Sequence, residues 1–233
     1  MADRVVSRFD DAAADHAERR AGEASFRLQV AAARSFLPDA PGRILDLGCG
    51  SGALAGALGE IPGSYVGADL SPGMLREARR RDLAVARSEA GRLPFGGASF
   101  DAVLALGLLE YVPDPGAVLR EVARVLAPGG VAVLTWPNTR APARLWMRLF
   151  PGRFDQDLAR RLPLRQVREG VRAAGLEPLR ARTTNAALLP WPLDALLPGL
   201  ARGLARACDP LLRCPPGSWL GTQFVLAARR PAD

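Results

Sequence analysis

Residues 43–53 read RILDLGCGSGA, a short apolar run that passes an acid and then enters three alternating glycines. The run from Arg43 to Leu47 has the length and composition of a buried strand, and ALAGAL (residues 53–58) continues it as a helix of small side chains. Glycine adopts backbone angles closed to other residues and has no side chain to hold a ligand away from the main chain. The stretch therefore predicts a strand, a tight turn and a helix N-terminus against which a nucleotide-like ligand can lie.

Outward from this turn, strands and helices alternate along the chain. Further strands are expected at residues 64–69, 83–87, 100–106, 131–136, 176–184 and 221–228. Helices are expected at residues 11–37, 73–81, 116–127, 143–150 and 164–174. The pairs Ser71-Pro72 and Asp114-Pro115 are typical of an N-cap followed by a first-turn proline. This order predicts an α/β fold, a parallel sheet with helices on both faces.

Length and composition set the class of protein. The chain has 233 residues, 48% hydrophobic and 24% charged, which is typical of one folded domain and excludes overall disorder. No window approaches the roughly 18 uninterrupted apolar residues of a membrane-spanning helix, and the first 20 residues lack an apolar secretory core. We therefore expect a cytoplasmic protein. Three cysteines and a single histidine give no metal-like spacing, so neither a metal site nor a disulfide framework is expected.

The charge is unevenly distributed. The net charge is +7, and all 31 basic residues are arginine, which is typical of a GC-rich genome rather than of a nucleic-acid-binding surface. Residues 1–138 carry a net charge of −2 and residues 139–233 carry +9. The basic surplus therefore lies in the last two fifths of the chain.

The glycine turn alone leaves two interpretations open. Gly48, Gly50 and Ala53 also satisfy a dinucleotide-binding fingerprint, and Asp69 follows at about the distance expected for a ribose-binding acid. A nicotinamide-dependent dehydrogenase is therefore one alternative. The acid inside the strand, Asp46, and the tight spacing of the glycines favour another class.

With Asp46 in place, the turn resembles motif I of the class I S-adenosylmethionine-dependent methyltransferases. The resemblance continues in order through VGADLSPGMLREA, SEAGRLPF, FDAVLALGLLEYVPDP and RVLAPGGVAVLTWPN, and it covers residues 43–138 well. The terminal GTQFVLAARRP is similar to the last, antiparallel strand of that family. The resemblance implies a Rossmann-like, doubly wound, seven-stranded, mostly parallel sheet with an antiparallel last strand. It also implies one methyltransferase domain over residues 1–233, with a helical lid (1–42), a cofactor-binding core (43–138) and a substrate-side part (139–233).

The resemblance further implies S-adenosyl-L-methionine as the cofactor. The glycines would lie against its methionine portion, with Asp46 orienting the turn, while Asp69 would accept hydrogen bonds from both ribose hydroxyls. Leu70 and Met74 would pack on the adenine, Glu89 stands where the family usually has Asp, and Leu106 and Gly107 would line the reacting methyl. The implied cofactor-binding residues are Asp46, Gly48, Cys49, Gly50, Gly52, Asp69, Leu70, Met74, Glu89, Ala90, Leu106 and Gly107.

No catalytic residue is assigned, because methyl transfer from a sulfonium needs alignment more than it needs a base. The stretch FDDAAADH resembles the family's N-terminal FDxxAxxY, with His16 at the position of the aromatic lid residue. His16 as a general base and His16 as a lid or surface residue both remain open. Tyr111 stands where many relatives carry histidine. Trp136 and Asn138 are interpreted either as lining an acceptor pocket or as structural turn residues.

The acceptor is expected to be a small or lipid-like molecule, with an anionic group left open. Residues 188–206 mix leucines, a tryptophan and arginines as an interfacial helix would, so peripheral contact of residues 188–212 with an anionic membrane surface is a hypothesis, and a hairpin packed on the sheet edge is the alternative. An RNA methyltransferase is a second candidate, made less favourable by the absence of a separate RNA-binding module in the sequence. A non-catalytic cofactor-binding protein is the third, because fold does not dictate activity.

Overall fold

The computed structural model describes residues 2–39, 41–59, 63–141, 162–184, 199–200, 203–204, 207 and 221–232. The strands in these residues are β1 (Arg43–Leu47), β2 (Ser64–Asp69), β3 (Ala84–Arg87), β4 (Phe100–Leu106), β5 (Leu126–Pro137), β6 (Glu177–Thr184) and β7 (Gln223–Arg229). The main helices are α1 (Ala2–Asp11), α2 (Ala13–Gly22), α3 (Ala24–Arg34), α4 (Ala53–Leu58), α5 (Pro72–Arg79), α6 (Pro115–Val125) and α8 (Leu164–Ala173).

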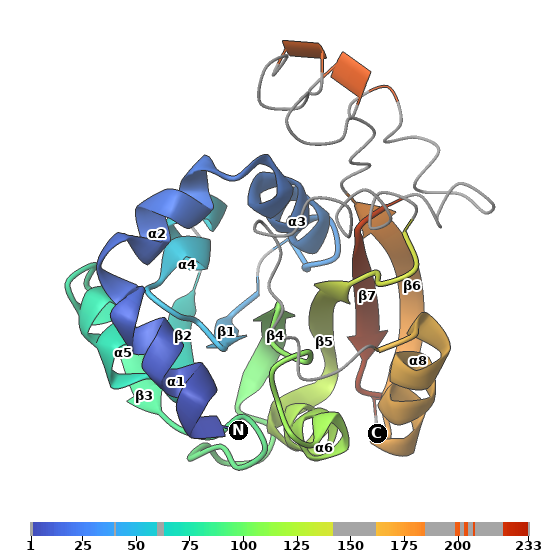
Figure 1. The fold of residues 1–233 in the computed structure, drawn as a ribbon. Coiled ribbons are helices and arrows are strands. Elements are labelled where there is room, and N and C mark those ends of the chain that lie inside the picture. The colour runs from blue at the N-terminus through green and yellow to red at the C-terminus, as the bar shows by residue number, and fades with distance from the viewer. Residues whose placement is uncertain are drawn as a thin grey trace.

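The strands form one seven-stranded sheet in the order β3-β2-β1-β4-β5-β7-β6 (Figure 1). Strands β1 to β5 pair in parallel, and β7 pairs antiparallel with both β5 and β6. The order reverses direction at β1, where the chain goes first to β2 and β3 and later to β4 on the other side. The prediction of a doubly wound, mostly parallel sheet with an antiparallel last strand is therefore confirmed.

The buried strands carry apolar side chains on both faces of the sheet. Successive side chains in a strand point to opposite faces, so neighbours in sequence belong to different cores. Ile44 packs in one cluster, with Leu104 of β4 and Leu54 of α4, while Leu45 packs in the other, with Val103 of β4. Both faces are thus covered, as expected for a parallel sheet.

Helices α3 and α4 contribute to the first cluster, and α6 and α8 contribute to the second. Figure 1 shows α1 and α2 beside α4 and α5, at the β3–β2 half of the sheet, and α8 beside β6 at the other end. The N-terminal helices therefore cover the half of the sheet that contains the glycine turn.

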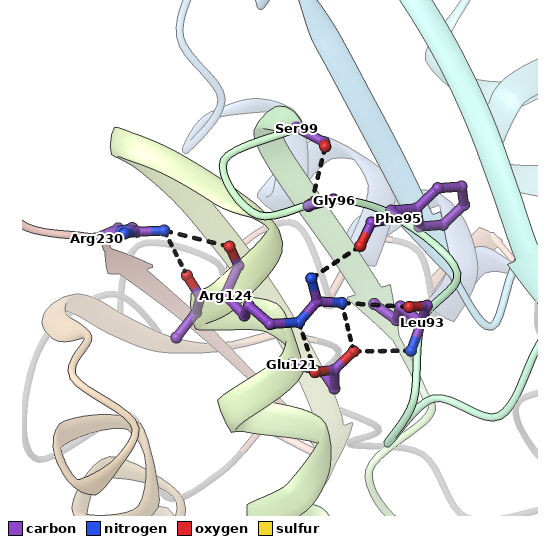
Figure 2. A network of polar contacts seen from close by, with 8 residues as sticks. Leu93, Phe95, Gly96, Ser99, Glu121, Arg124 and Arg230 are labelled. Carbon is purple, nitrogen blue, oxygen red and sulfur yellow. Dashed lines mark hydrogen bonds and ion pairs between the residues drawn. The ribbon is translucent and has the colours of Figure 1, made fainter.

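An arginine network joins the end of α6 to two other segments (Figure 2). The Arg124 guanidinium donates to both carboxylate oxygens of Glu121, at 2.7 and 2.8 Å, and to the carbonyls of Leu93 and Phe95. Arg230, just after β7, donates to three carbonyls at the end of α6, including that of Leu126 at 2.7 Å. These contacts satisfy helix-terminal carbonyls and fix the C-terminal strand to the core of the fold.

Two boundaries differ from the predicted ones. The expected single helix over residues 11–37 is two helices, α2 and α3, separated at Glu23, and a further helix, α1, precedes them, because α1 and α2 turn to dock on α4 and α5. Strand β5 begins at Leu126 rather than at residue 131, because the Gly129 N–H donates to the Arg230 carbonyl and the Arg230 N–H to the Gly130 carbonyl. These hydrogen bonds bring the Pro-Gly-Gly segment into the sheet.

Some predictions fall outside the described residues. The expected helix at 143–150 lies there, as does most of the segment 188–212 for which membrane contact was suggested. The division of residues 1–233 into lid, core and substrate-side part stays a prediction. Within the described helices, none has the length and apolarity required to span a bilayer.

Candidate functional site

A cavity of about 720 Å³ lies at the carboxyl ends of the parallel strands, where their loops meet the N-terminal helices. This volume is within the range of roughly 300–1,000 Å³ typical of small-molecule and cofactor sites. Eleven of the twelve predicted site residues line it: Asp46, Gly48, Cys49, Gly50, Asp69, Leu70, Met74, Glu89, Ala90, Leu106 and Gly107. The topology thus brings these residues, which lie between positions 46 and 107 of the sequence, to one cavity.

The glycine turn is held against the neighbouring strand. The N–H groups of Gly48 and Cys49 donate to the Ala68 carbonyl of β2 at 2.7 and 3.1 Å. Gly48, Gly50 and Gly52 have φ values of +76°, +53° and +82°, in the left-handed region that favours glycine. The turn therefore requires glycine for its backbone angles, independently of any ligand.

Gly52 differs from the other two glycines, because it does not line the cavity. It is the N-cap residue of α4, and a Cβ there would lie 2.3 Å from Leu83 Cδ1. In the structure it allows close packing of α4 against the segment after α5. Its predicted contact with the cofactor stays a prediction.

Asp69 ends β2 at the wall of the cavity. Its Oδ2 accepts from the Gly50 N–H at 2.9 Å, and its Oδ1 accepts from the Ser71 N–H at 2.8 Å. Burial raises the pKa of this carboxyl, and the hydrogen bonds oppose the rise. Each carboxylate oxygen has two acceptor positions, so each keeps one position for a further donor. Asp69 thus orients the glycine turn and can still accept hydrogen bonds from two neighbouring hydroxyls.

Asp46 lies one strand away, at the cavity wall beneath the turn. It is 2% exposed, and Tyr65 Oη donates to its Oδ2 at 2.7 Å. Burial raises its pKa to about 7, and the nearby Asp69 charge adds to the rise. A cation in the cavity would favour the ionised form of both carboxylates.

At the β2–β3 end of the cavity, the lining combines apolar side chains with an exposed acid. Met74 is buried in the first turn of α5, and Leu70 precedes that helix. Glu89 is exposed, and its backbone forms an isolated antiparallel β-bridge with Arg92. Cys49 is buried, and burial raises the pKa of its thiol, so it is an inert small side chain rather than a nucleophile.

The N-terminal helices are attached to this wall by two side chains. Asp10 of α1 accepts from Ser71 Oγ at 2.5 Å and from the Gly73 N–H at 2.7 Å, both at the N-terminus of α5. His16 of α2 is hydrogen-bonded through Nδ1 to Ser51 Oγ in the glycine turn, at 2.8 Å. Both helices therefore close over the cavity from the side of the turn.

His16 lines the cavity in its neutral form. Burial lowers its pKa to about 4, and Arg20 adds to the effect. Phe9 contacts its ring edge-on, with centroids 6.4 Å apart, and contacts Tyr111 in the same way at 5.5 Å. These aromatic rings form part of the cavity lining, as the position of His16 in FDDAAADH implied.

The buried polar residues of the lining that the sequence analysis missed include Gln29 and Glu110. Gln29 of α3 and Glu110, after β4, are each 4% exposed and line the cavity. The signal for Gln29 is a glutamine on the apolar face of a helix, three residues after Phe26 and four before Ala33. The signal for Glu110 is an acid inside the apolar stretch that follows the fourth strand.

Trp136 and Asn138 do not line the cavity. Trp136 is fully buried, donates through Nε1 to the Leu162 carbonyl at 2.8 Å and packs on Phe224. Asn138 donates through Nδ2 to the Gly221 carbonyl at 2.8 Å. The structure therefore supports the second interpretation, in which Trp136 and Asn138 are structural residues at the end of the sheet.

The charge of the lining favours a cationic ligand over an anionic one. The carboxylates among the described lining residues are Glu23, Asp46, Asp69, Glu89, Glu110 and Asp114. The arginines among them are Arg8, Arg19, Arg20 and Arg92. The described residues include no cluster of three or more histidine, cysteine or acidic side chains that could hold a metal ion.

Comparison with known proteins finds that part of the chain is similar to methyltransferases. Residues 45–134 match the model of a methyltransferase domain family. The chain is 35% identical over 144 residues to a ubiquinone biosynthesis O-methyltransferase of Xanthomonas campestris, covering 59% of this chain and 58% of the relative. It is 41% identical over 107 residues to a demethylmenaquinone methyltransferase of a Mycobacterium species, covering 45% and 46%. The matches thus span about half the length of these curated relatives.

Solved structures share the fold over nearly the whole chain. A methyltransferase complex with the Haloferax volcanii Trm112 activator superposes with a TM-score of 0.71 at 23% identity, covering 96% of this chain and 97% of that one. An S-adenosylmethionine-dependent methyltransferase of Mesorhizobium loti gives 0.61 at 24% identity, covering 90% and 99%. At these identities the likeness concerns the fold.

Proposed function

We propose that the chain is a class I S-adenosylmethionine-dependent methyltransferase that methylates a small-molecule or lipid-like acceptor, because residues 45–134 match the model of a methyltransferase domain family. The observation that carries the proposal is the single cavity in which the glycine turn, Asp46 and Asp69 meet. When bound, S-adenosylmethionine supplies a methyl group on a sulfonium, a leaving group that is already activated.

The residues present fit this cofactor. The backbone at Gly48 and Gly50 lets the methionine portion approach the helix N-terminus. The free acceptor positions of the Asp69 carboxylate suit two ribose hydroxyls, and Asp46 suits the amino group. The excess of carboxylates in the lining suits the net positive charge of S-adenosylmethionine. Glu89, exposed at the β3 end, would reach the adenine amino group, with Leu70 and Met74 against the ring.

The chain contributes alignment and the exclusion of water. Leu106 ends β4 and Gly107 follows it, both line the cavity, and α1 and α2 cover the cavity from the side of the glycine turn. These elements would hold an acceptor in line with the methyl group that the cofactor would supply and would exclude water from it, and the proton of a hydroxyl acceptor would pass to solvent. No side chain is assigned the role of base.

The experiment compares cofactors side by side. In isothermal titration calorimetry, the protein should bind S-adenosylmethionine and show no measurable affinity for NAD. Binding of NAD alone would favour a dehydrogenase and contradict the proposal.

The acceptor class is tested by incubation with radiolabelled S-adenosylmethionine and fractionated lysate. Label should enter the small-molecule or lipid fraction, in keeping with the quinone-pathway names of the curated relatives. Label in RNA, with steeply salt-dependent tRNA binding, would support the RNA alternative. Cofactor binding without label in any fraction would support a non-catalytic protein.

We further propose that the reaction takes place in the cytoplasm and that the basic C-terminal part contacts anionic membrane surfaces. The net charge of +9 in residues 139–233 supports electrostatic attraction to such a surface. A flotation assay should show binding to vesicles containing phosphatidylglycerol and none to neutral phosphatidylcholine vesicles. Equal partition to both would exclude the electrostatic contact.

A further inference from the structure

Gln29 is a buried polar side chain that has no role among the proposed cofactor contacts. It lies on α3 and lines the cavity, with Phe26 and Ala33 on the same face of the helix, three residues before and four residues after it. Gln29 is 4% exposed, and its carboxamide oxygen Oε1 is buried without a hydrogen-bond partner within the described part of the chain. The helix thus carries an unsatisfied acceptor among apolar neighbours.

An unsatisfied buried amide destabilises the fold, whereas an apolar side chain of the same size at this position would be favourable. Phe26 and Val30, 3% and 6% exposed, show that the surroundings of Gln29 accept apolar side chains. A polar atom in such a place is explained by a donor that enters with a ligand. Unsatisfied groups of this kind are typical of functional sites.

Gln29 comes from a different part of the fold than the residues suited to the nucleoside. The residues suited to the nucleoside, such as Asp69 and Met74, come from β2 and the start of α5. Helix α3 instead packs against β7 and β6, on the other side of β1 in the strand order. Thr222 and Gln223, at the start of β7, line the same cavity.

One arginine of the cavity lining, Arg20, is already paired with a carboxylate. Arg20 donates to Glu23 at 3.0 Å and lies over the Phe26 ring, 4.5 Å from its centroid. Among the described lining residues, carboxylates outnumber arginines. The excess of carboxylates over arginines therefore disfavours an anionic group in the cavity.

We propose that Gln29 is a specificity-determining residue: its Oε1 accepts a hydrogen bond from a hydroxyl or amine N–H of an uncharged, largely apolar acceptor. This assignment rests on the proposed methyltransferase function and names the substrate class of that site. The neutral amide oxygen is too weak a base to remove a proton, so Gln29 positions the acceptor and takes no part in bond making.

The test uses a matched pair of probes, 4-hexylphenol and its methyl ether 4-hexylanisole, titrated into the protein saturated with S-adenosylhomocysteine. The wild type should bind the phenol at least about tenfold more tightly than the ether, as one hydrogen bond in an apolar site allows. In Gln29→Met, which keeps length and volume, the preference should fall below about threefold. Gln166→Met, on the exposed side of α8, is the matched control and should keep the full preference.

A second readout separates ligand recognition from a structural role. Without ligands, Gln29→Met should unfold at the same temperature as the wild type or about 2–4 °C higher, because it removes an unsatisfied buried group. Unfolding several degrees lower would show that the amide serves the fold and would overturn the proposal.

Three outcomes of the titration would also overturn it: no binding of either probe, equal wild-type affinity for both, or an unchanged preference in Gln29→Met. If S-adenosylhomocysteine itself fails to bind, the proposed function fails first. If it binds and only the phenol preference is missing, the assignment of Gln29 fails alone.

Discussion

Removal of the Asp10 carboxylate should weaken the attachment of α1, which together with α2 covers one side of the cavity. Asp10 of α1 accepts hydrogen bonds from Ser71 Oγ and the Gly73 N–H, and both donors lie at the N-terminus of α5, where a negative charge is favourable. Ser71 Oγ in turn accepts from the Met74 N–H at 3.1 Å. In Asp10→Ala, α1 loses its polar attachment to the wall of the cavity.

The magnitude follows from these two hydrogen bonds. Each charge-assisted bond contributes up to about 1.5–3 kcal/mol when buried, and the partial exposure of Asp10 reduces the sum to about 1–2 kcal/mol. At 1.4 kcal/mol per factor of ten, α1 should open about 5–30 times more often. The cofactor should dissociate faster by a similar factor.

The assay is amide hydrogen exchange of α1 and α2, together with the dissociation rate of S-adenosylmethionine by stopped flow. The hydrogen bond from Ser71 lowers the pKa of Asp10, so the contribution to stability is complete above the unfolded value of 3.8 and is lost as the pH falls through the lower folded value. The effect should therefore be constant between pH 6 and 8. Asp11→Ala, with the same charge change at an exposed neighbour, is the control. If the exchange of α1 and the dissociation rate are equal in the two variants, Asp10 does not hold the cover.

Two further predictions concern Asp46 of β1 and Gly67 of the neighbouring strand β2. Burial raises the pKa of Asp46 from 3.8 to about 7. The contribution of protonated Asp46 to stability is therefore complete below about pH 4 and is lost as the pH rises through 7. The melting temperature of the ligand-free protein should fall between pH 5 and 8, and it should fall less in Asp46→Asn. An equal fall in the variant would assign the pH dependence to other groups. In Gly67→Ala the new Cβ would lie 2.7 Å from Cys49 Sγ and 3.1 Å from Val85 Cγ1, so urea denaturation should show a loss of about 1–3 kcal/mol. Gly56→Ala, in α4 with no atom within 4 Å of its Cβ, should be neutral or stabilising, and equal stability of the two variants would contradict the packing argument.

The sheet and most of the cavity wall could be predicted because their signals are local. The run RILDL and the three glycines specify a buried strand and a left-handed turn within ten residues, and the structure has both. Asp114 caps α6 through its carboxylate, as Asp114-Pro115 predicted. Strand order and the antiparallel last strand followed from the resemblance rather than from the residues themselves.

The remaining features depend on contacts between distant segments. The start of β5 at Leu126 depends on hydrogen bonds to Arg230, about a hundred residues later. The break between α2 and α3 reflects docking on α4 and α5, and an alanine-rich sequence carries little sign of it. The burial of Gln29 could be inferred from its helix face, but its place in the cavity required the fold.

The central claim is that the carboxylate of Asp69, held against the glycine turn, binds the ribose of S-adenosylmethionine. Calorimetric titration of Asp69→Ala with S-adenosylmethionine tests it most directly, with Asp101→Ala as the control, because the Asp101 carboxylate also accepts a backbone N–H, that of Arg43, outside the cavity. The account predicts affinity at least about 100-fold weaker in Asp69→Ala and unchanged in Asp101→Ala, for two lost hydrogen bonds to a charged group. Wild-type affinity in a folded Asp69→Ala protein would contradict it.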